Sequence, residues 1–164
     1  MLILSIDPAG AKADAFSMWQ MYPARRLMDF GWIDDPVDLI PDIQSCHWFL
    51  IEDQYMHRNF KVAKQLITKV GMYKGMYLAL GKAADKFALV NAATWKSRQG
   101  LLLSKAQNDS MTKTERKKYK EQATLEKARS ILVQQGYDHD IDVDVASAVL
   151  LPLVMQDVYE RGSS

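Results

Sequence analysis

The chain contains 164 residues, has a mass of 18.7 kDa and carries a net charge of +1. This length predicts one domain, spanning residues 1–164, with a hydrophobic core of its own. A hydrophobic content of 48% with 25% charged residues excludes an intrinsically disordered chain, and no apolar run reaches the roughly 18–20 residues that span a membrane. The first residues lack the basic segment of a signal peptide, and the single cysteine, Cys46, excludes an internal disulfide and a cysteine-based zinc site. We therefore expect a cytoplasmic protein with no membrane partner.

Charge is segregated along the chain. Residues 1–54 carry three basic and nine acidic side chains, residues 55–137 carry 17 and five, and residues 138–164 carry one and six. The middle segment therefore has a net charge of +12 and lies between two acidic segments. This pattern predicts a surface that binds a polyanion beside a carboxylate-rich site. A solvent-exposed basic helix is the alternative interpretation.

The first third of the chain predicts mainly strands. Residues 1–6 form an apolar run that predicts a buried strand, which the turn sequence Asp-Pro-Ala-Gly ends. Residues 15–21 and 26–33 are rich in aromatic and apolar side chains and predict two further strands of a meander. A short helix is expected to open at Asp35-Pro36, because proline suits the first helical turn. The sequence HWFLIED at residues 47–53 predicts another buried strand, which ends in carboxylates.

The remainder of the chain predicts mainly helices. Apolar residues at helical spacing predict a helix over about residues 59–84, followed by a strand at 86–92 and a loop or hairpin at 93–105. Residues 112–135 predict a highly charged helix, and residues 143–159 predict a last apolar helix with a kink at Pro152. The order of these elements predicts an α/β domain with a mixed sheet.

Carboxylates fall at the ends of several predicted elements. Asp7 ends the first strand, and Glu52 and Asp53 end the strand after the short helix. Because side chains alternate between the two faces of a strand, only one of Glu52 and Asp53 can point with Asp7. The acidic run at residues 138–144 supplies a further carboxylate at the start of the last helix.

Such a cluster predicts metal-dependent nuclease chemistry. Clustered carboxylates remain ionised together when a hard divalent cation neutralises them. Two such ions can hold the attacking water and the leaving oxygen of a phosphodiester on opposite sides of phosphorus. For each acid alone, turn formation or helix capping is the ordinary alternative.

Four blocks of sequence together resemble the RuvC family of Holliday-junction resolvases, in its phage-type branch. They are LSIDPAG at 4–10, LIEDQYM at 50–56, ATWKSRQG at 93–100 with Lys105 beyond it, and DVASAVLLPL at 144–153. The resemblance covers essentially the whole chain and implies an RNase H-like fold, an α/β mixed five-stranded sheet flanked by helices. It also implies a homodimer that resolves four-way DNA junctions by paired symmetric nicks, in DNA recombination and repair. It further implies Mg²⁺ or Mn²⁺ dependence with two ions per active site and, for a phage-encoded chain, a bacterial host cytoplasm.

The resemblance assigns catalytic roles to individual positions. Asp7 matches the first catalytic acid of the family, Glu52 matches its strand-end acid, and Asp144 matches the first acid of its terminal-helix pattern. These three carboxylates are the expected metal ligands. Lys96 matches a basic position of the loop that faces the scissile phosphate, so we expect it to stabilise charge on the phosphate oxygens.

Ser147 is a departure from the family pattern, which has a second acid three residues after Asp144. Positions three apart share a helix face, and a hydroxyl is a poorer ligand for Mg²⁺ than a carboxylate. Three explanations stay open. Asp144 suffices with the two strand acids while Ser147 acts through a bound water; or Asp142 or Asp140 replaces the missing ligand; or the chain carries an inactivating change. We favour the first explanation.

Candidate DNA contacts come from the basic middle segment. Tyr55 matches the aromatic residue that the family inserts at the junction centre, where it would stack on an unpaired base. Lys96 and Lys105 match basic positions that face the DNA backbone. Because long basic side chains neutralise phosphates, further candidates are Arg58, Lys61, Arg98, Lys117 and Lys118. A solvent-exposed position, or for Tyr55 a place over the core, is the alternative.

The favoured function is therefore a structure-selective, metal-dependent endonuclease that resolves four-way junctions. Because of Ser147, the alternative is a junction-binding dimer with weak or no nuclease activity. A relative of the same fold that acts on RNA or on other branched DNA is a third interpretation.

Overall fold

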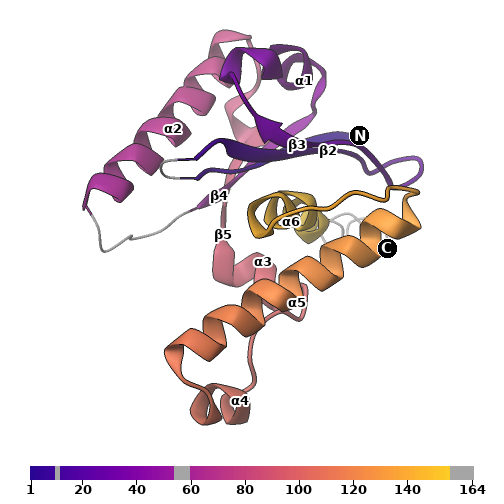
Figure 1. Cartoon of the computed structure of the whole chain (residues 1–164). Coiled ribbons are helices and arrows are strands. Elements are labelled where there is room, and N and C mark those ends of the chain that lie inside the picture. Colours follow the sequence, from indigo (N-terminus) through magenta and orange to yellow (C-terminus); the bar gives the residue numbers. More distant parts are fainter. Residues whose placement is uncertain (10–11, 54–59, 156–164) are drawn as a thin grey trace.

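A computed structural model describes residues 1–9, 12–53 and 60–155 of the chain (Figure 1). Its centre is one mixed sheet with the strand order β3-β2-β1-β4-β5. The strands are β1 (Leu2–Asp7), β2 (Asp14–Gln20), β3 (Arg26–Ile33), β4 (Trp48–Asp53) and β5 (Phe87–Asn91).

Helices connect and cover these strands. The α-helices are α1 (Ile40–Ser45), α2 (Phe60–Ala79), α3 (Ala92–Arg98), α4 (Lys105–Ser110), α5 (Lys113–Gln134) and α6 (Val143–Leu150). Three short 3-10 helices are η1 (Pro36–Leu39), η2 (Ala84–Lys86) and η3 (Leu151–Met155). Within the described ranges, no helix is both long and apolar enough to cross a membrane.

The strand pairing explains why β1 lies in the middle of the sheet. β1 pairs antiparallel with β2, which pairs antiparallel with β3, so the first three strands form a meander. β1 also pairs parallel with β4, which pairs parallel with β5. A strand with neighbours on both sides and helices over both faces needs apolar residues throughout, and the apolar run of β1 meets this need. The carboxyl ends of β1, β4 and β5 therefore meet at one edge of the sheet.

Two hydrophobic cores lie on opposite faces of the sheet. In Figure 1, α1 and α2 lie on one side, and α5 and α6 lie on the other. The first core joins Ile43 of α1 and Tyr73 and Tyr77 of α2 to Phe49 of β4. The second core joins α5, α6 and η3 to the other face, and it contains Trp19 and the buried Trp95.

Hydroxyl groups of the sheet hold α6 in place because of Pro152. Proline has no N–H, so the carbonyl of Ala148, four residues earlier, lacks its normal helical donor. The hydroxyls of Ser5 and Ser17 donate to this carbonyl at 2.7 and 2.8 Å. The indole of Trp19 donates to the next carbonyl, that of Val149, at 3.1 Å. The sheet thereby fixes the helix that begins beside Asp144.

The structure confirms the predicted α/β class and the mixed five-stranded sheet with flanking helices. Two local predictions were wrong. Residues 93–98 do not belong to the predicted loop or hairpin but to α3, because Asn91 caps this helix by accepting from the backbone N–H of Ala93. Residues 99–104 do form a loop, which leads to α4 at Lys105. The last α-helix does not continue through a kink at Pro152, because it gives way to η3 at Leu151. Residues 156–159 of that predicted helix lie outside the described residues.

Candidate active site

Asp7 and Glu52 are brought side by side by the register of β1 and β4. Ile6 pairs with Ile51 in these parallel strands, so Asp7 and Glu52, which follow them, are neighbours across the two strands. Adjacent strands in a sheet lie about 4.8 Å apart. Both carboxylates are buried, with exposed fractions of 6% for Asp7 and 3% for Glu52.

The alternation of side chains decides which face of the sheet carries this pair. The hydroxyl of Ser5 reaches α6, so Asp7, two residues later on β1, faces α6 as well. Leu50 packs in the α6 core, so Glu52, two residues later on β4, shares that face. Asp53 points to the opposite face, which agrees with the expectation that only one of the two acids joins Asp7.

Asp144 lies in the first turn of α6, which packs on this face of the sheet. The cap of the helix is Asp142, whose Oδ1 accepts from the backbone N–H groups of Asp144 and Val145 at 3.1 Å each. Asp140 pairs with Arg129 at 2.8 Å on the surface. These contacts give Asp142 and Asp140 structural roles, and metal binding by either residue stays a prediction.

Burial and nearby negative charge raise the pKa values of Glu52 and Asp144. Burial is the main cause that raises the pKa of Glu52. The Lys96 ammonium opposes this shift, as does the indole of Trp95, although its Nε1 makes no hydrogen bond of regular geometry. The negative charge of Asp144 raises the pKa of Glu52 further, so the strand acid and the helix acid interact electrostatically.

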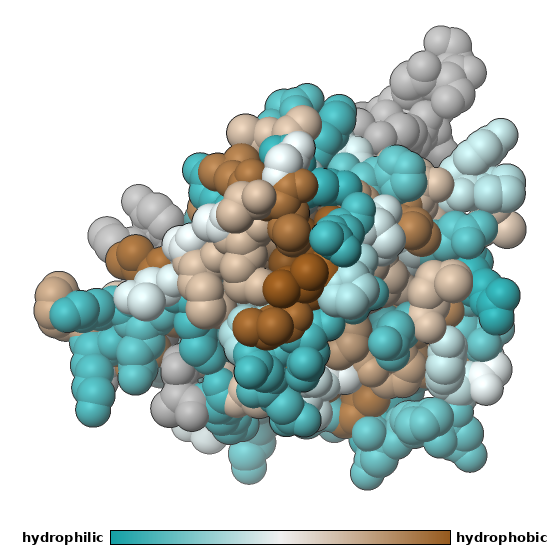
Figure 2. Space-filling view, turned by 90° about the horizontal axis from the view of Figure 1, so that it is seen from above, coloured by the Kyte–Doolittle hydropathy of each residue, from teal (hydrophilic) through white to brown (hydrophobic). Residues whose placement is uncertain are grey.

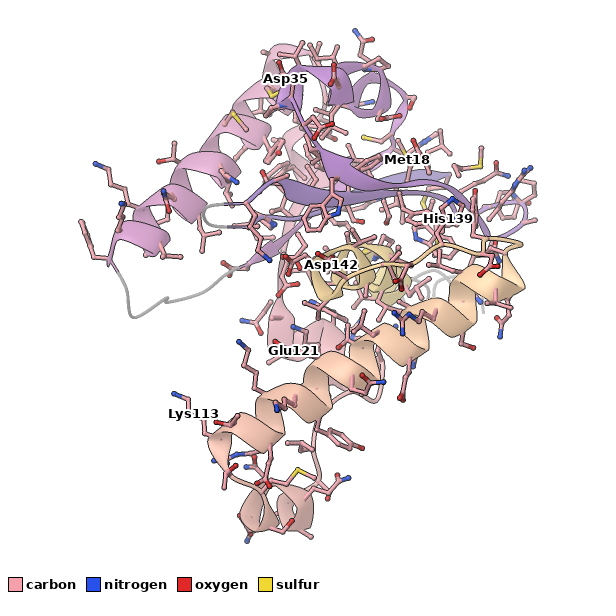
Figure 3. All side chains as sticks on the ribbon, viewed as in Figure 1. Met18, Asp35, Lys113, Glu121, His139 and Asp142 are labelled. Atoms are coloured by element: carbon pink, nitrogen blue, oxygen red, sulfur yellow. The ribbon has the colours of Figure 1, made fainter. Side chains whose placement is uncertain are left out.

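Asp144 has a raised pKa for similar reasons. Burial is the largest cause, Asp142 adds to it, and Lys12 opposes it. Glu121 of α5 also raises the pKa of Asp144, so α5 contributes a carboxylate near the start of α6. Figure 3 shows Asp142 at the start of α6 above Glu121 on α5. No sequence pattern singles out Glu121, because only the packing of α5 on α6 brings it near Asp144.

Two lysines flank the carboxylates. The Nζ of Lys96, on α3, lies 3.7 Å from Oε1 of Glu52 and 4.8 Å from the centre of the Trp95 ring. The Nζ of Lys12, in the loop between β1 and β2, lies 3.9 Å from Oδ2 of Asp144. Lys96 was predicted near the site and lies there. Lys12 was missed, although it is the only basic residue before Arg25 and follows Asp7 by five positions.

Ser147 lies one turn after Asp144 on α6 and is buried, with 4% exposure. The predicted relation between the two positions is therefore present in the structure. The hydroxyl of Ser147 occupies the helix position for which the family pattern has an acid.

The donor set of the site suits a hard divalent ion. All candidate ligands are carboxylate oxygens, which Mg²⁺ and Mn²⁺ prefer. Oε2 of Glu52 is buried and has no hydrogen-bond partner, an arrangement that favours a cation beside it. Within residues 1–9, 12–53 and 60–155, no three carboxylate, histidine or cysteine side chains are already close enough to hold one ion together. Lys12 and Lys96 instead lie next to Asp144 and Glu52.

The predicted DNA contacts that the structure describes, apart from Lys96, fall at the start of α2, at the end of α3 and in α4 and α5. Tyr55 and Arg58 lie outside the described residues. Lys61 is exposed in the first turn of α2. Arg98 is at the end of α3, where its Nη1 donates to the carbonyl of Val154 at 3.1 Å, so part of its bonding capacity serves to join α3 to η3.

The remaining candidates belong to a projection formed by α4 and the first turns of α5. Lys105 begins α4, and Figure 1 shows α4 well away from the sheet. Lys105 therefore does not lie beside Glu52 as Lys96 does. Lys117 and Lys118 are exposed on α5, and Lys117 pairs with Glu121 at 3.6 Å, one turn along the helix.

Comparison with known proteins identifies the fold. No protein-family model and no curated protein matches the chain. The structure of T. thermophilus RuvC in complex with a Holliday junction substrate superposes with a TM-score of 0.63 at 13% identity, covering 100% of this chain and 98% of that chain. The chain has the RuvC fold. A second structure of Thermus thermophilus RuvC gives a TM-score of 0.60 at 15% identity, covering 99% of this chain and 97% of that one.

This result confirms the resemblance to RuvC at the level of the fold over the whole chain. The phage-type branch stays a prediction. A fold can host different chemistries, so the function has to be argued from the carboxylates, lysines and surfaces described above.

Proposed function

We propose that the chain is a structure-selective, metal-dependent DNA endonuclease that resolves four-way junctions by paired symmetric nicks. The observation that supports this most strongly is the arrangement of two buried carboxylates, Asp7 and Glu52, on the sheet face where α6 presents Asp144. This arrangement occurs in a RuvC fold, and one of the similar structures is a RuvC bound to a Holliday junction substrate.

Asp7, Glu52 and Asp144 would hold the Mg²⁺ or Mn²⁺. When bound, such ions supply a nucleophilic water at neutral pH and neutralise the phosphate. The protein contributes fixed geometry, because Asp7 and Glu52 are held by the sheet and Asp144 by a capped helix. Buried ligands of this kind need little reorganisation when the substrate reacts.

Lys96 would stabilise the charge that develops on the phosphate oxygens. Its Nζ lies beside Glu52 at the edge of the carboxylate pair and is partly shielded from solvent. The ring of Trp95 beneath it restricts the side chain, and a fixed ammonium in a partly dry site acts more strongly on an anion than one in water. The same ammonium favours the ionised form of Glu52.

Branched DNA is the proposed partner because of the charge pattern on α5. The first half of α5 carries five basic side chains, Lys113, Arg116, Lys117, Lys118 and Lys120. It projects beyond the sheet below the site, where a DNA arm that leaves the active site would pass (Figure 1). Basic side chains along such a path neutralise backbone phosphates without reading sequence.

A homodimer is proposed from the exposed face of α2. Phe60, Ile67 and Leu78 of this helix are exposed, and Figure 2 shows hydrophobic side chains gathered on the face that carries α1 and α2. Apolar patches of this kind mark interfaces.

The charges around the patch favour a second copy of the same chain. The first turns of α2 carry Lys61 and Lys64, whereas α1 and η1, which carry Asp38 and Asp42, pack toward the other end of α2 through Ile43. A two-fold axis across α2 would bring the basic end of one copy to the acidic end of the other. It would also pair two active sites, as two symmetric nicks require.

The proposed function is tested by nicking and gel-shift assays on end-labelled DNA with Mn²⁺. A four-way junction, a flap, a linear duplex and an RNA–DNA hybrid of matched length should be compared. We expect selective binding of the junction and symmetric nicks in two opposing strands. Preferential cleavage of the flap or of the hybrid would refute junction resolution and favour the third interpretation.

Ser147 supports the second candidate, a junction-binding dimer with weak or no nuclease activity. The same assays separate the two candidates, because this dimer would shift the junction as tightly and produce no nicks. Nicking at a measurable single-turnover rate would exclude it.

A further inference from the structure

Lys12 is an ammonium group at the candidate active site that the proposed function does not yet use. Its Nζ lies 3.9 Å from Oδ2 of Asp144, while its side chain is 73% exposed. An ion pair at such an exposed position contributes little and does not hold a long side chain by itself. The position of Lys12 must therefore be determined by the backbone that carries it.

That backbone is held from behind by Lys69 of α2. The Nζ of Lys69 donates to the carbonyl of Ala9 at 2.6 Å and to the carbonyl of Lys12 at 3.0 Å. The same ammonium pairs with Oδ1 of Asp14 at 2.6 Å. One side chain thus joins both ends of the turn that follows Asp7.

Asp14 completes this connection from a buried position, with 4% exposure. Its Oδ1 also accepts from the backbone N–H of Ala9 at 2.9 Å, and its Oδ2 accepts from the hydroxyl of Tyr73 at 2.7 Å. A buried carboxylate is stable only with partners of this kind, and once satisfied it is a rigid anchor. This anchor lies on the α2 face of the sheet, directly behind the face that carries Asp7.

We propose that Lys12 is a second phosphate-contacting residue of the active site and that Lys69, through Asp14, is its positioning residue. This inference rests on the proposed nuclease function. Lys96 lies on the Glu52 side of the carboxylates and Lys12 on the Asp144 side, so a phosphate at the acids would meet an ammonium from each side. When the carboxylates hold divalent ions, Asp144 attracts Lys12 less, and the exposed side chain is available to the phosphate anion.

The first test compares Lys12→Gln with the wild type in single-turnover nicking of a four-way junction. We expect the rate to fall by about 100-fold, as for the loss of one preorganised donor to a developing anion. Junction binding should also be measured in Ca²⁺ over a range of salt concentrations. The slope of log K against log[salt] should be about 0.9 smaller in magnitude for Lys12→Gln than for the wild type, which corresponds to the loss of one phosphate contact. The role of Lys12 would be overturned if Lys12→Gln nicked at the wild-type rate with an unchanged salt slope. It would also be overturned if the variant bound Mn²⁺ more tightly while the salt slope of its junction binding stayed the same.

The second test examines Lys69. Lys69→Met should reduce nicking by about the same factor as Lys12→Gln, and the double variant should be no slower than either single variant, because both act through one group. Lys69→Arg, which keeps a cation with several donors, should restore most of the rate. Additive losses in the double variant, or no rescue by Lys69→Arg, would overturn the positioning role.

Lys82→Met is the matched control for general destabilisation. The Nζ of Lys82 also donates to two carbonyls, those of Gln44 at 3.0 Å and Cys46 at 2.6 Å, but at the start of β4, away from the carboxylates. Its loss should lower the melting temperature without changing the nicking rate of the folded protein. An equal loss of nicking in Lys82→Met would assign the Lys69 effect to stability and overturn the proposal.

The proposed function and this inference fail in different ways. A wild-type chain that nicks no junction contradicts the function, whereas the salt slope of junction binding still tests the phosphate contact of Lys12 without cleavage. If the wild type nicks the junction and Lys12→Gln nicks it at the same rate, only the inference about Lys12 is contradicted.

Discussion

At the scale of single residues, the site combines acids that the sequence identifies with neighbours that only the fold brings near. Strand ends and the acidic run before the last helix indicate a cluster of carboxylates, and the resemblance to RuvC assigns Asp7, Glu52 and Asp144 within it. Lys12 and Glu121 come from a turn and from a second helix, and neither lies in a motif. Their contribution depends on tertiary packing, so no local pattern predicts it.

Ser147 gives the first prediction at this scale. If its hydroxyl acts through a bound water, Ser147→Ala should slow nicking by less than about tenfold, because a water-mediated contact contributes on the order of 1 kcal/mol. Ser147→Asp should tighten Mn²⁺ binding, measured by calorimetry, because a carboxylate then replaces a neutral hydroxyl. Complete loss of nicking in Ser147→Ala, with a normal melting temperature, would show instead that the hydroxyl is indispensable.

Cys46 gives the second prediction. Burial is the main cause that raises the pKa of its thiol to about 11, against an ordinary value of 9.0, although the Lys82 ammonium opposes the shift. A neutral, buried thiol is unreactive. At about pH 8, a disulfide reagent should therefore modify the native protein far more slowly than the urea-unfolded protein.

The same shift has a defined effect on stability. A raised pKa in the folded state means that the stabilising contribution of the thiol is complete below about pH 9 and is lost as the pH rises toward 11. The free energy of unfolding should therefore fall more steeply over this range in the wild type than in Cys46→Ala. Equal slopes for the two proteins would contradict the assignment.

At the scale of elements, most of the fold can be predicted from local pattern. The five strands, the long helix α2 and the charged helix α5 follow from apolar periodicity, and proline and glycine mark several of their ends. The α3 helix could not be predicted in this way, because its first turn continues directly from β5 and only the cap at Asn91 separates them. The last helix ends early because Pro152 removes a donor, and the effect on its geometry depends on the sheet beneath it.

The attachment of α6 to the sheet can be tested by a mutant cycle. In the double variant Ser5→Ala, Ser17→Ala, the carbonyl of Ala148 loses both donors and stays buried. We expect a loss of about 2–3 kcal/mol in the free energy of unfolding, measured in urea. Adding Pro152→Ala restores a backbone N–H four residues after Ala148. Pro152→Ala should therefore lower the free energy of unfolding less in the double variant than in the wild type. An equal cost in both backgrounds would contradict the argument.

At the scale of the whole molecule, the acidic and basic segments of the chain lie in different parts of the fold. Acids of both acidic segments lie at the carboxyl ends of β1 and β4 and at the start of α6, while much of the basic middle segment forms α2 and the α4–α5 projection. The length of the chain predicts one domain, and similarity to RuvC extends over the whole of it. The oligomeric state belongs to this scale, because it depends on a surface rather than on a motif.

The proposed dimer predicts that Ile67→Glu produces a monomer. The side chain is 73% exposed, so the substitution should leave the melting temperature of the folded chain nearly unchanged while placing a charge in the interface. Sedimentation of the wild type and the variant over a range of concentrations measures this. Thr68→Glu, at an exposed polar position next to Ile67, is the matched control. A wild type that sediments as a monomer would contradict the proposed dimer.

The central claim is that Asp7, Glu52 and Asp144 act together on a DNA phosphate with divalent ions. The most direct measurement compares Asp7→Asn, which keeps the size and most of the polarity of the side chain, with the wild type in Mn²⁺. Nicking of a labelled four-way junction and its gel shift should be measured in the same reactions. We predict that the variant binds the junction with wild-type affinity and nicks it at least about 1,000-fold more slowly. Nicking by Asp7→Asn at a rate near that of the wild type would contradict the account.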